Sequence, residues 1–348
     1  MRAADSEAQK RDWLLRALMP WAPLIEPLET VAGDDRWGYR DRVCLTAEWA
    51  EEGWRLGLLA RERVVPIPDC PIHSSRVRAA AHALAKALPP GPSFPLRYYV
   101  QSAAQATLVL KSAAAPPDDW LTHTVGQQLA AAGMEGLWLH LFPAVGRNVF
   151  AKNTWHLLWG QSRSRDDQGL RYGPTAFQQL LPALYGRALE AAERYLAPGP
   201  GDRVADLYCG GGQTLRRWSD RGATALGVEL GGEAVACARE NAPAAAVLRG
   251  TCAARLPQLE SWAVADGARR LLYANPPRTG LEPEVADWVA EAYRPARMAY
   301  LSCSAGTLRR DLEQLEGGGL RVERIIPYDF FPQTWHVETL VLLERADP

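Results

Sequence analysis

The spacing of apolar residues divides the chain into two parts with different patterns. Between about residues 37 and 160, apolar and polar residues alternate with a period of two, which is typical of half-buried strands. This alternation predicts strands at 43–49, 54–60, 64–67, 97–101, 107–111, 137–142 and 154–159. Helical patterns interrupt them at 75–88 and 120–132, so we expect an α+β module.

The pattern changes after 161–169, a polar and loop-like stretch. A helix predicted at 177–195 is followed by helices that alternate with short apolar strands. These strands are predicted at 204–208, 225–229, 271–274, 298–302, 325–328 and 339–343. Such alternation predicts an α/β fold with a doubly wound, mostly parallel sheet. Ahead of both parts, 8–18 predicts an amphipathic helix that packs on another part of the chain.

Length, composition and charge narrow the class of protein. A chain of 348 residues suits two domains, and 47% hydrophobic residues provide a sizeable core. No run of 18 apolar residues and no apolar signal segment is present, so we expect a cytoplasmic protein without a membrane partner. A net charge of −1 argues against a general polyanion binder without excluding RNA. Six scattered cysteines form no Cys-x-x-Cys pair, which indicates neither a disulfide framework nor a zinc site.

A glycine-rich segment, Asp206-x-x-x-Gly210-x-Gly212, follows one predicted strand and precedes a helix. Glycines at this position let a ligand approach the backbone at the switch point of an α/β sheet. A dinucleotide fingerprint requires a third glycine where Leu215 stands, which disfavours NAD. Glu229 ends the next strand and could accept hydrogen bonds from both ribose hydroxyls of S-adenosylmethionine. A solvated glutamate is the alternative.

Asn275-Pro-Pro-Arg278 lies at the end of another predicted strand. The two prolines would hold the Asn275 amide rigidly beside the pocket. This amide could donate to O4 and accept from N3 of a uracil. An ordinary proline loop is the alternative interpretation.

Cys303 lies between a predicted strand and a predicted helix, so we expect its thiol at the carboxyl edge of the sheet. The helix N-terminus at Gly306 and Thr307 would lower the thiol pKa and make the group nucleophilic. A buried core cysteine is the alternative, because that is the usual role of an unpaired cysteine.

Glu338 begins the last strand-like segment, after the apolar and aromatic residues Phe330, Phe331, Trp335 and Val337. Partial burial among these neighbours would raise the carboxyl pKa towards that of a useful base, whereas a solvated glutamate is the alternative. A methyl donor, a thiol and a carboxylate together suggest methylation of a pyrimidine at C5.

Arginines lie beside aromatic residues early in the first part, where Arg40 and Arg42 are close in sequence to Trp37 and Tyr39. Such pairs suit stacking on unpaired RNA bases. Because acidic residues are interspersed, a solvated face explains the pattern equally well.

Together these segments resemble the RNA uracil-5 methyltransferase family, whose members make 5-methyluridine in tRNA and rRNA. The resemblance runs from about residue 8 to the end of the chain, and the combination of motifs is highly specific. The matching segments are 37–42, 56–59, 67–72, 206–212, 275–281, 302–311 and 330–338.

The resemblance implies a class I, Rossmann-like methyltransferase domain at 166–348, an α+β RNA-binding module at 34–165, and an N-terminal helix at 1–33 packed on the methyltransferase domain. It implies that Cys303 is the nucleophile and that Glu338 removes the C5 proton. The implied contacts to S-adenosylmethionine are Gln179, Asp206, Tyr208, Gly210, Gly212, Glu229 and Asn275. The implied contacts to RNA are Asn275, Arg278, Arg40 and Arg42.

The chain also departs from the family pattern. Of the four cysteines that bind a [4Fe–4S] cluster in many bacterial relatives only Cys70 is present, so no cluster is expected. The OB-like domain of many relatives is not found. Leu181 replaces an asparagine, and Ser304-Ala305-Gly306 replaces the usual residues after the nucleophile. Asn275 matches a bacterial rRNA-modifying subgroup, which favours rRNA over tRNA.

Two other functions stay open at this point. Methylation of cytosine C5 in RNA would keep the fold and the cofactor, with the Asn275 amide rotated to accept from N4. A degenerate relative that binds and remodels RNA would explain the departures at Leu181 and 304–306. No obligate protein partner is indicated.

Overall fold

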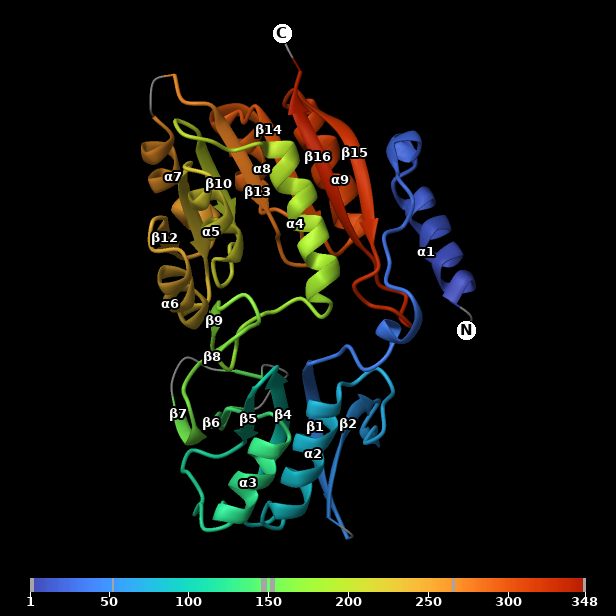
Figure 1. The fold of residues 1–348 in the computed structure, drawn as a ribbon, viewed down its shortest axis with the longest axis vertical. Coiled ribbons are helices and arrows are strands. Elements are labelled where there is room, and N and C mark those ends of the chain that lie inside the picture. Colours follow the sequence, from blue (N-terminus) through green and yellow to red (C-terminus); the bar gives the residue numbers. More distant parts are fainter. Residues whose placement is uncertain (1–2, 52, 145–148, 151–153, 265–266, 347–348) are drawn as a thin grey trace. The chain divides into compact units, whose positions relative to one another are not determined.

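The computed structural model describes residues 3–51, 53–144, 149–150, 154–264 and 267–346. The chain forms two compact units (Figure 1). Unit 1 comprises Met1–Gly33 and Leu181–Pro348, and unit 2 comprises Asp34–Leu180. The N-terminal segment therefore belongs to the same unit as the C-terminal half. Unit 2 extends beyond the boundary predicted after residue 165.

Unit 2 is built on a seven-stranded sheet with the order β3-β2-β1-β4-β5-β6-β7. Its strands are β1 Arg42–Ala50, β2 Gly53–Ala60, β3 Arg63–Pro66, β4 Leu96–Ser102, β5 Gln105–Leu110, β6 Gly136–Leu141 and β7 Trp155–Gly160. Only β5 and β6 pair in parallel, and α3 (His123–Ala131) connects them. The predicted α+β module is therefore present, and each predicted strand is found within one or two residues of its predicted bounds.

Two helices pack beside each other in unit 2, α2 (Ser75–Ala87) and α3. The Ser74 hydroxyl caps α2 by accepting a hydrogen bond from the Val77 amide at 3.1 Å. Val77, Ala80 and Leu84 then fall on one face and are buried in the core of the unit. The polar stretch predicted as a loop contains β8 (Ser164–Arg165), which pairs with β9 (Arg171–Tyr172) just after the stretch to form a small hairpin.

Unit 1 contains a second seven-stranded sheet, with the order β12-β11-β10-β13-β14-β16-β15. Its strands are β10 Arg203–Leu207, β11 Thr224–Glu229, β12 Ala246–Arg249, β13 Arg270–Ala274, β14 Arg297–Ser302, β15 Leu320–Tyr328 and β16 Glu338–Arg345. All neighbours pair in parallel except β16, which is antiparallel to β14 and β15. This confirms the predicted doubly wound sheet, although β12 was not predicted. The strand order reverses between β10 and β13, where α/β sheets bind their ligands.

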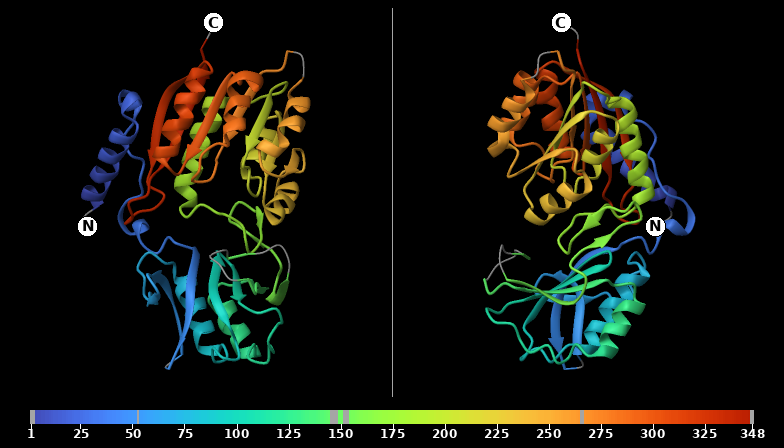
Figure 2. Two further views of the ribbon diagram at one scale, coloured as in Figure 1. Left: turned by 180° about the vertical axis from the view of Figure 1, so that it is seen from behind. Right: turned by 60° about the vertical axis from the view of Figure 1, so that its left-hand side comes forward.

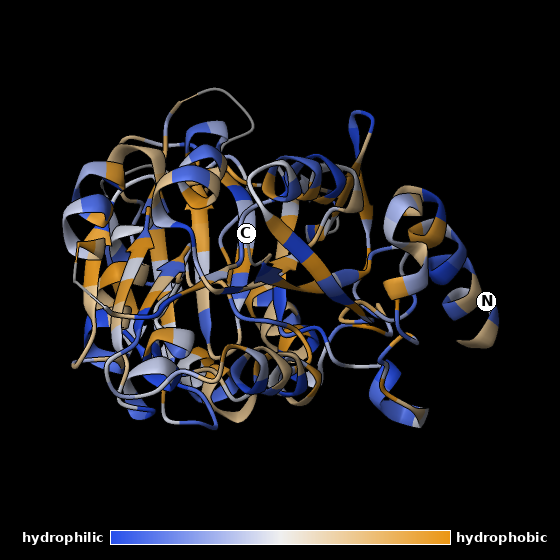
Figure 3. Ribbon diagram, turned by 90° about the horizontal axis from the view of Figure 1, so that it is seen from above, coloured by the Kyte–Doolittle hydropathy of each residue, from blue (hydrophilic) through white to orange (hydrophobic). Residues whose placement is uncertain are grey.

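Helices cover both faces of this sheet (Figure 2). One layer is formed by α4 Pro182–Leu196, α5 Gln213–Asp220 and α6 Gly232–Asn241. The other layer is formed by α7 Leu256–Ala263, α8 Pro283–Asp287, the π-helical turn η4 Trp288–Tyr293, and α9 Ala305–Gly317. Apolar residues concentrate in the strands and on the inner sides of the helices (Figure 3). The helix predicted from residue 177 begins only at Pro182, which suits the first helical position.

The N-terminal helix α1 (Ala3–Ala17) and the turn η1 (Met19–Leu24) pack on α9 and the outer strand β15. Isolated bridges from Ile25 to Ile325 and from Glu29 to Tyr328 continue that contact along the sheet edge. The buried stripe of α1 contains Ser6, Lys10 and Leu14, at a spacing of four residues. The helix was predicted to be amphipathic. The burial of its two polar residues Ser6 and Lys10 was not predicted. Among the described residues, no helix is long and apolar enough to cross a membrane.

Candidate active site

The strand register of unit 1 brings the predicted site residues to one edge of the sheet. Leu207 pairs with Val228 on one side and with Ala274 on the other, and Ala274 pairs with Tyr300. The residues that follow these positions therefore leave the sheet side by side at its carboxyl edge. They are the glycine-rich loop after β10, Glu229, Asn275 and Cys303.

The glycine-rich loop turns sharply because three of its residues adopt left-handed backbone conformations. Tyr208, Gly210 and Gly212 have φ values of 61°, 54° and 83°. A Cβ on Gly212 would lie 2.8 Å from the Cα of Ala238, so only glycine fits there. A Cβ on Gly210 would meet no atom within 4 Å, so the backbone at Gly210 borders open space. The loop thus forms a cradle that a ligand can approach closely.

Glu229 is oriented by two backbone amides. Its carboxylate accepts hydrogen bonds from the amides of Gly210 at 3.1 Å and Gly231 at 2.6 Å. The side chain is half-buried at the end of β11, next to the open space in front of Gly210. The remaining acceptor capacity of the carboxylate suits vicinal hydroxyl groups.

Asp206 and Tyr208 are held by protein partners. Asp206 is fully buried and accepts a hydrogen bond from Trp218 Nε1 at 2.8 Å, which ties β10 to α5. Burial raises the pKa of Asp206 to about 7. The Tyr208 hydroxyl donates to Glu282 Oε2 at 3.3 Å, and the same oxygen accepts the Ala253 amide at 3.2 Å. In this structure the hydrogen bonds of the two side chains join the glycine-rich loop and the strand before it to neighbouring elements.

The Asn275 loop is tied to α9, the helix that follows Cys303. The backbone N–H of Asn275 donates to the Leu207 carbonyl at the end of β10, whereas the Thr307 hydroxyl of α9 donates to the carbonyl of Arg278. Asp311 of α9 is buried and accepts hydrogen bonds from the Leu281 amide at 2.9 Å and from Tyr300 Oη at 2.6 Å. One helix therefore positions both the Asn275 loop and the segment that carries Cys303.

Cys303 and Glu338 are neighbours across two antiparallel strands. The last registered pair of β14 and β16 is Ser302 with Thr339. Extending this register by one residue places Cys303 opposite Glu338, on the same face of the sheet. Opposite side chains in such a pair have Cβ atoms about 4.5–5.5 Å apart. Glu338 is only 3% exposed, whereas Cys303 is half-buried.

The electrostatics of this pair differ from the expectation for Cys303. Burial raises the thiol pKa, and the Glu338 carboxylate raises it further, whereas Arg278 lowers it. The predicted net lowering of the thiol pKa is therefore wrong, because burial and Glu338 raise it. Burial also raises the pKa of Glu338 to about 7, against a weaker opposite effect of Arg278. Since the two charges oppose each other, the pair favours one negative charge at a time.

The burial of Glu338 does not involve all the neighbours that were expected. Phe330 and Val337 are buried, but the Trp335 side chain is 71% exposed. Two further side chains of unit 1, the half-buried Tyr185 and the buried Tyr273, were not predicted from the sequence. Burial raises the pKa of both hydroxyls, and the charges of Asp206 and Glu338 raise it further. Sequence offers little signal for them because tyrosine is a common core residue.

Three predicted site residues belong to unit 2. The Arg42 guanidinium lies 4.6 Å from the centre of the Phe177 ring, and Arg40 Nε donates to the Arg42 carbonyl at 3.2 Å. The Gln179 side chain is partly buried, and its Oε1 has no hydrogen-bond partner among the described residues. The roles of Gln179, Arg40 and Arg42 stay predictions.

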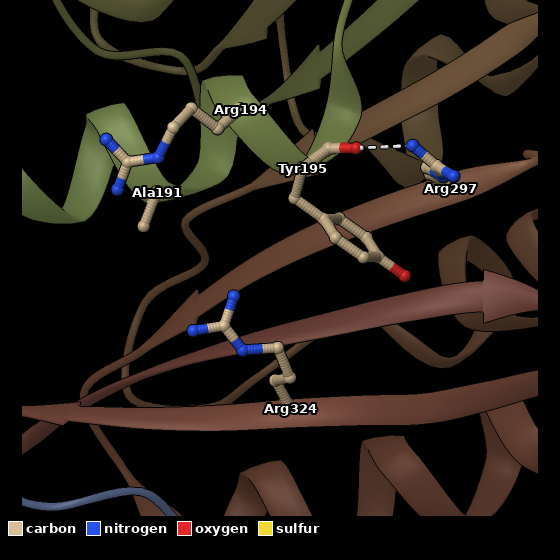
Figure 4. Close-up of a pocket in the computed structure, with 5 residues that line it drawn as sticks. All are labelled: Ala191, Arg194, Tyr195, Arg297 and Arg324. Carbon is tan, nitrogen blue, oxygen red and sulfur yellow. Dashed lines mark hydrogen bonds between the residues drawn. The ribbon is translucent and has the colours of Figure 1, made fainter.

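A cavity of about 250 Å³ lies away from this edge, between α4 and the strands β14 and β15 (Figure 4). It is lined by Ala191, Arg194, Tyr195, Arg297 and Arg324. Arg297 pairs with Glu344 at 3.0 Å and Arg324 pairs with Glu26 at 2.5 Å, so carboxylates already offset these charges. The cavity contains none of the predicted site residues. No group of three metal-ligating side chains occurs in the described part of the chain.

Comparisons with known proteins agree with this geometry. A family model described as tRNA (uracil-5-)-methyltransferase matches residues 253–346. The 23S rRNA (uracil(1939)-C(5))-methyltransferase RlmD of Thiobacillus denitrificans is 39% identical over 50% of this chain and 41% of its own. An uncharacterised RNA methyltransferase of Gloeobacter violaceus is 30% identical over 93% of this chain and 74% of its own. The chain therefore spans less than half of the first relative and about three quarters of the second.

A solved structure shows the same fold. The tRNA (uracil-54, C5)-methyltransferase of Pyrococcus abyssi, in complex with S-adenosyl-L-homocysteine, has a TM-score of 0.71 to this chain. The two sequences are 20% identical, and the match covers 99% of this chain and 84% of the other. The likeness confirms the predicted fold class, a Rossmann-like methyltransferase fold with an added α+β module.

Proposed function

The chain belongs to the RNA uracil-5-methyltransferase family, and we propose that it transfers a methyl group from S-adenosylmethionine to C5 of a uridine in structured RNA. The observation that carries the proposal is the pairing of Cys303 with the buried Glu338, at the same sheet edge as the glycine cradle and Glu229. The proposed nucleophile, base and nucleoside site would thus lie together at the edge where α/β sheets bind ligands.

The residues present fit the cofactor. Gly210 presents bare backbone to open space, Gly212 allows the loop to pack closely against Ala238, and Glu229 is held by two amides so that it can accept the ribose hydroxyls. Asp206 and Tyr208 would contribute to cofactor binding by fixing the conformation of the glycine-rich loop. Further contacts are proposed for Asn275 and for Gln179. When bound, S-adenosylmethionine supplies the methyl group that C5 of the substrate accepts.

Cys303 has the first chemical role in the proposed mechanism. Its thiol loses a proton to solvent water, and the thiolate adds to C6 of the uracil, which places the electron pair of the C5–C6 double bond on C5 and makes that carbon nucleophilic. Binding of RNA must assist this step because burial and Glu338 raise the pKa of the free thiol. Arg278 acts in the opposite sense and favours the thiolate.

Glu338 completes the cycle after the methyl group has been added. Its carboxylate takes the C5 proton, the electrons of that bond restore the double bond between C5 and C6, and the Cys303 thiolate leaves. A carboxyl pKa of about 7 lets the group act as a base near neutral pH. Because the pair favours one negative charge at a time, departure of the thiolate is coupled to neutralisation of Glu338.

The proposed substrate is an unpaired uridine of rRNA rather than tRNA. The 39% identity to a 23S rRNA enzyme and the asparagine at position 275 support this choice. Asn275 would read the O4 and N3 edge of the uracil, and Arg278 would contact the RNA backbone. Arg40 and Arg42 of unit 2 would hold flanking RNA. The target base must leave its stack to reach Cys303.

The experiment is methyl transfer to total RNA from a strain that lacks the gene, followed by nucleoside analysis and mapping. We expect 5-methyluridine at a single rRNA position. 5-Methylcytidine would instead establish the cytosine enzyme, and RNA binding without methyl transfer would favour a non-catalytic relative. Cys44→Ala removes an exposed cysteine of unit 2 and should leave the activity unchanged.

A further inference from the structure

The loop that joins β15 to β16 presents one large aromatic side chain to solvent. It spans residues 329–337 and ends directly before Glu338. Phe330 is fully buried and Val337 is 3% exposed, whereas Trp335 is 71% exposed. An exposed indole contributes little to the packing of the loop, although it lies close in sequence to the buried carboxyl of Glu338. Exposed aromatic side chains often mark binding sites.

The loop is held in place by contacts with α1 and by hydrogen bonds of its own. The exposure of Trp335 is therefore a feature of an ordered segment. Lys10 of α1 forms an ion pair with Asp329 at 2.5 Å and also donates to the Phe331 carbonyl at 3.1 Å. The Thr334 hydroxyl donates to the Phe331 carbonyl at 2.7 Å and accepts the His336 amide at 3.2 Å. A rigid side chain loses little entropy when a ligand binds to it.

The Trp335 ring continues an array of aromatic rings. Its centre lies 4.2 Å from that of His336, at an interplanar angle of 32°. His336 in turn contacts Phe331 edge to face, with ring centres 5.7 Å apart. The imidazole therefore supports the indole from within the loop. The indole is the solvent-exposed end of this array.

We propose that Trp335 is a stacking site for an unpaired RNA base next to the target uridine. This inference rests on the proposed function, because it requires that a base is extruded towards Cys303 and Glu338. Extrusion leaves the neighbouring base without one stacking partner, and an indole can replace that partner. Glu338 is three positions after Trp335, so their Cα atoms lie at most about 10 Å apart. This distance corresponds to the length of a stack of about two to three bases.

The charge around the site suits this occupant. Arg278 is exposed and acts electrostatically on both Cys303 and Glu338, so a positive charge lies at the same edge as Trp335's loop. A cation and an exposed indole at one edge of the sheet favour a nucleotide, which offers an aromatic face and a phosphate together. A purely apolar protein partner would gain nothing from the guanidinium.

The test uses the RNA that the wild-type full chain methylates and compares Trp335→Ala, Trp335→Phe and Val264→Ala. Val264 is 80% exposed and precedes β13, on the opposite edge of the sheet, so Val264→Ala is the control. We expect Trp335→Ala to lower kcat/KM by about 5- to 150-fold, mainly through KM, with most of it recovered in Trp335→Phe. Cofactor affinity and the unfolding temperature should not change.

A second readout locates the stacked base. The same RNA carries 2-aminopurine in place of each nucleotide flanking the target, one at a time. Wild type and Trp335→Phe should quench the fluorescence at one flanking position, and Trp335→Ala should not. Equal kcat/KM and equal quenching in wild type and Trp335→Ala would refute the stacking site while leaving the methyltransferase proposal intact. Failure of wild type itself to methylate any RNA would refute both.

Discussion

The raised pKa of Glu338 predicts a pH-dependent gain of stability when the carboxyl is removed. A buried carboxyl with a pKa of about 7, against 4.5 when exposed, binds its proton more tightly in the folded state. Folding stability is therefore unaffected below about pH 4.5, falls as the pH rises towards 7, and stays lowered above it. Glu338→Gln removes this titration. The linkage arithmetic gives a gain over wild type that grows by about 2–3 kcal/mol between pH 5 and pH 8.

Urea unfolding of both proteins at pH 5 and pH 8 measures this difference. Asp206, whose pKa burial also raises, is present in both proteins, so its effect cancels in the comparison. Glu344→Gln is the matched control, because Glu344 lies on the same strand in a half-exposed pair with Arg297. That control should change stability by only about 0–1 kcal/mol at either pH. A Glu338→Gln effect that is the same at pH 5 and pH 8 would show that the carboxyl pKa is not raised.

Three further substitutions test other parts of the site. Glu229→Ala should weaken binding of S-adenosylhomocysteine about tenfold or more in calorimetry, with RNA affinity unchanged, because the ribose acceptor is lost. Gly212→Ala should lower stability by about 1–3 kcal/mol through the clash with Ala238, whereas Gly186→Ala in open space should not. Lys10→Met should lower stability by about 3–5 kcal/mol, and addition of Asp329→Leu should recover much of that loss.

The sheet of unit 1 could be predicted because most of its strands are short apolar runs between helical patterns. β12 was missed because its apolar residues directly follow an alanine-rich stretch at 242–246 and include only two residues that favour strands, Val247 and Leu248, of which only Val247 is buried. The start of α4 was placed too early because apolar residues precede Pro182, and their pattern alone does not show where the helix begins. The division at residue 180 depends on tertiary contacts, which a polar loop at 161–169 does not reveal.

The positions of Cys303 and Glu338 could be predicted because Cys303 directly follows one strand-like segment and Glu338 begins another. The sign of the thiol pKa shift could not, since it depends on burial and on the charge across the strand pair. Lys10 and Asp311 were missed for a related reason. Both are charged residues on the buried faces of helices, and only tertiary structure shows the buried partner that each one meets.

The central claim is that Cys303 attacks C6 first and that Glu338 acts only after methyl transfer. Denaturing electrophoresis of the full chain with its RNA and S-adenosylmethionine tests the order directly, with Cys44→Ala as the control cysteine variant. We predict that Glu338→Gln accumulates a covalent protein–RNA adduct whose uracil already carries the methyl group, because proton removal is blocked. Cys303→Ala should give neither adduct nor product. Appreciable methyl transfer to RNA by Cys303→Ala would contradict the nucleophile assignment and with it the proposed chemistry.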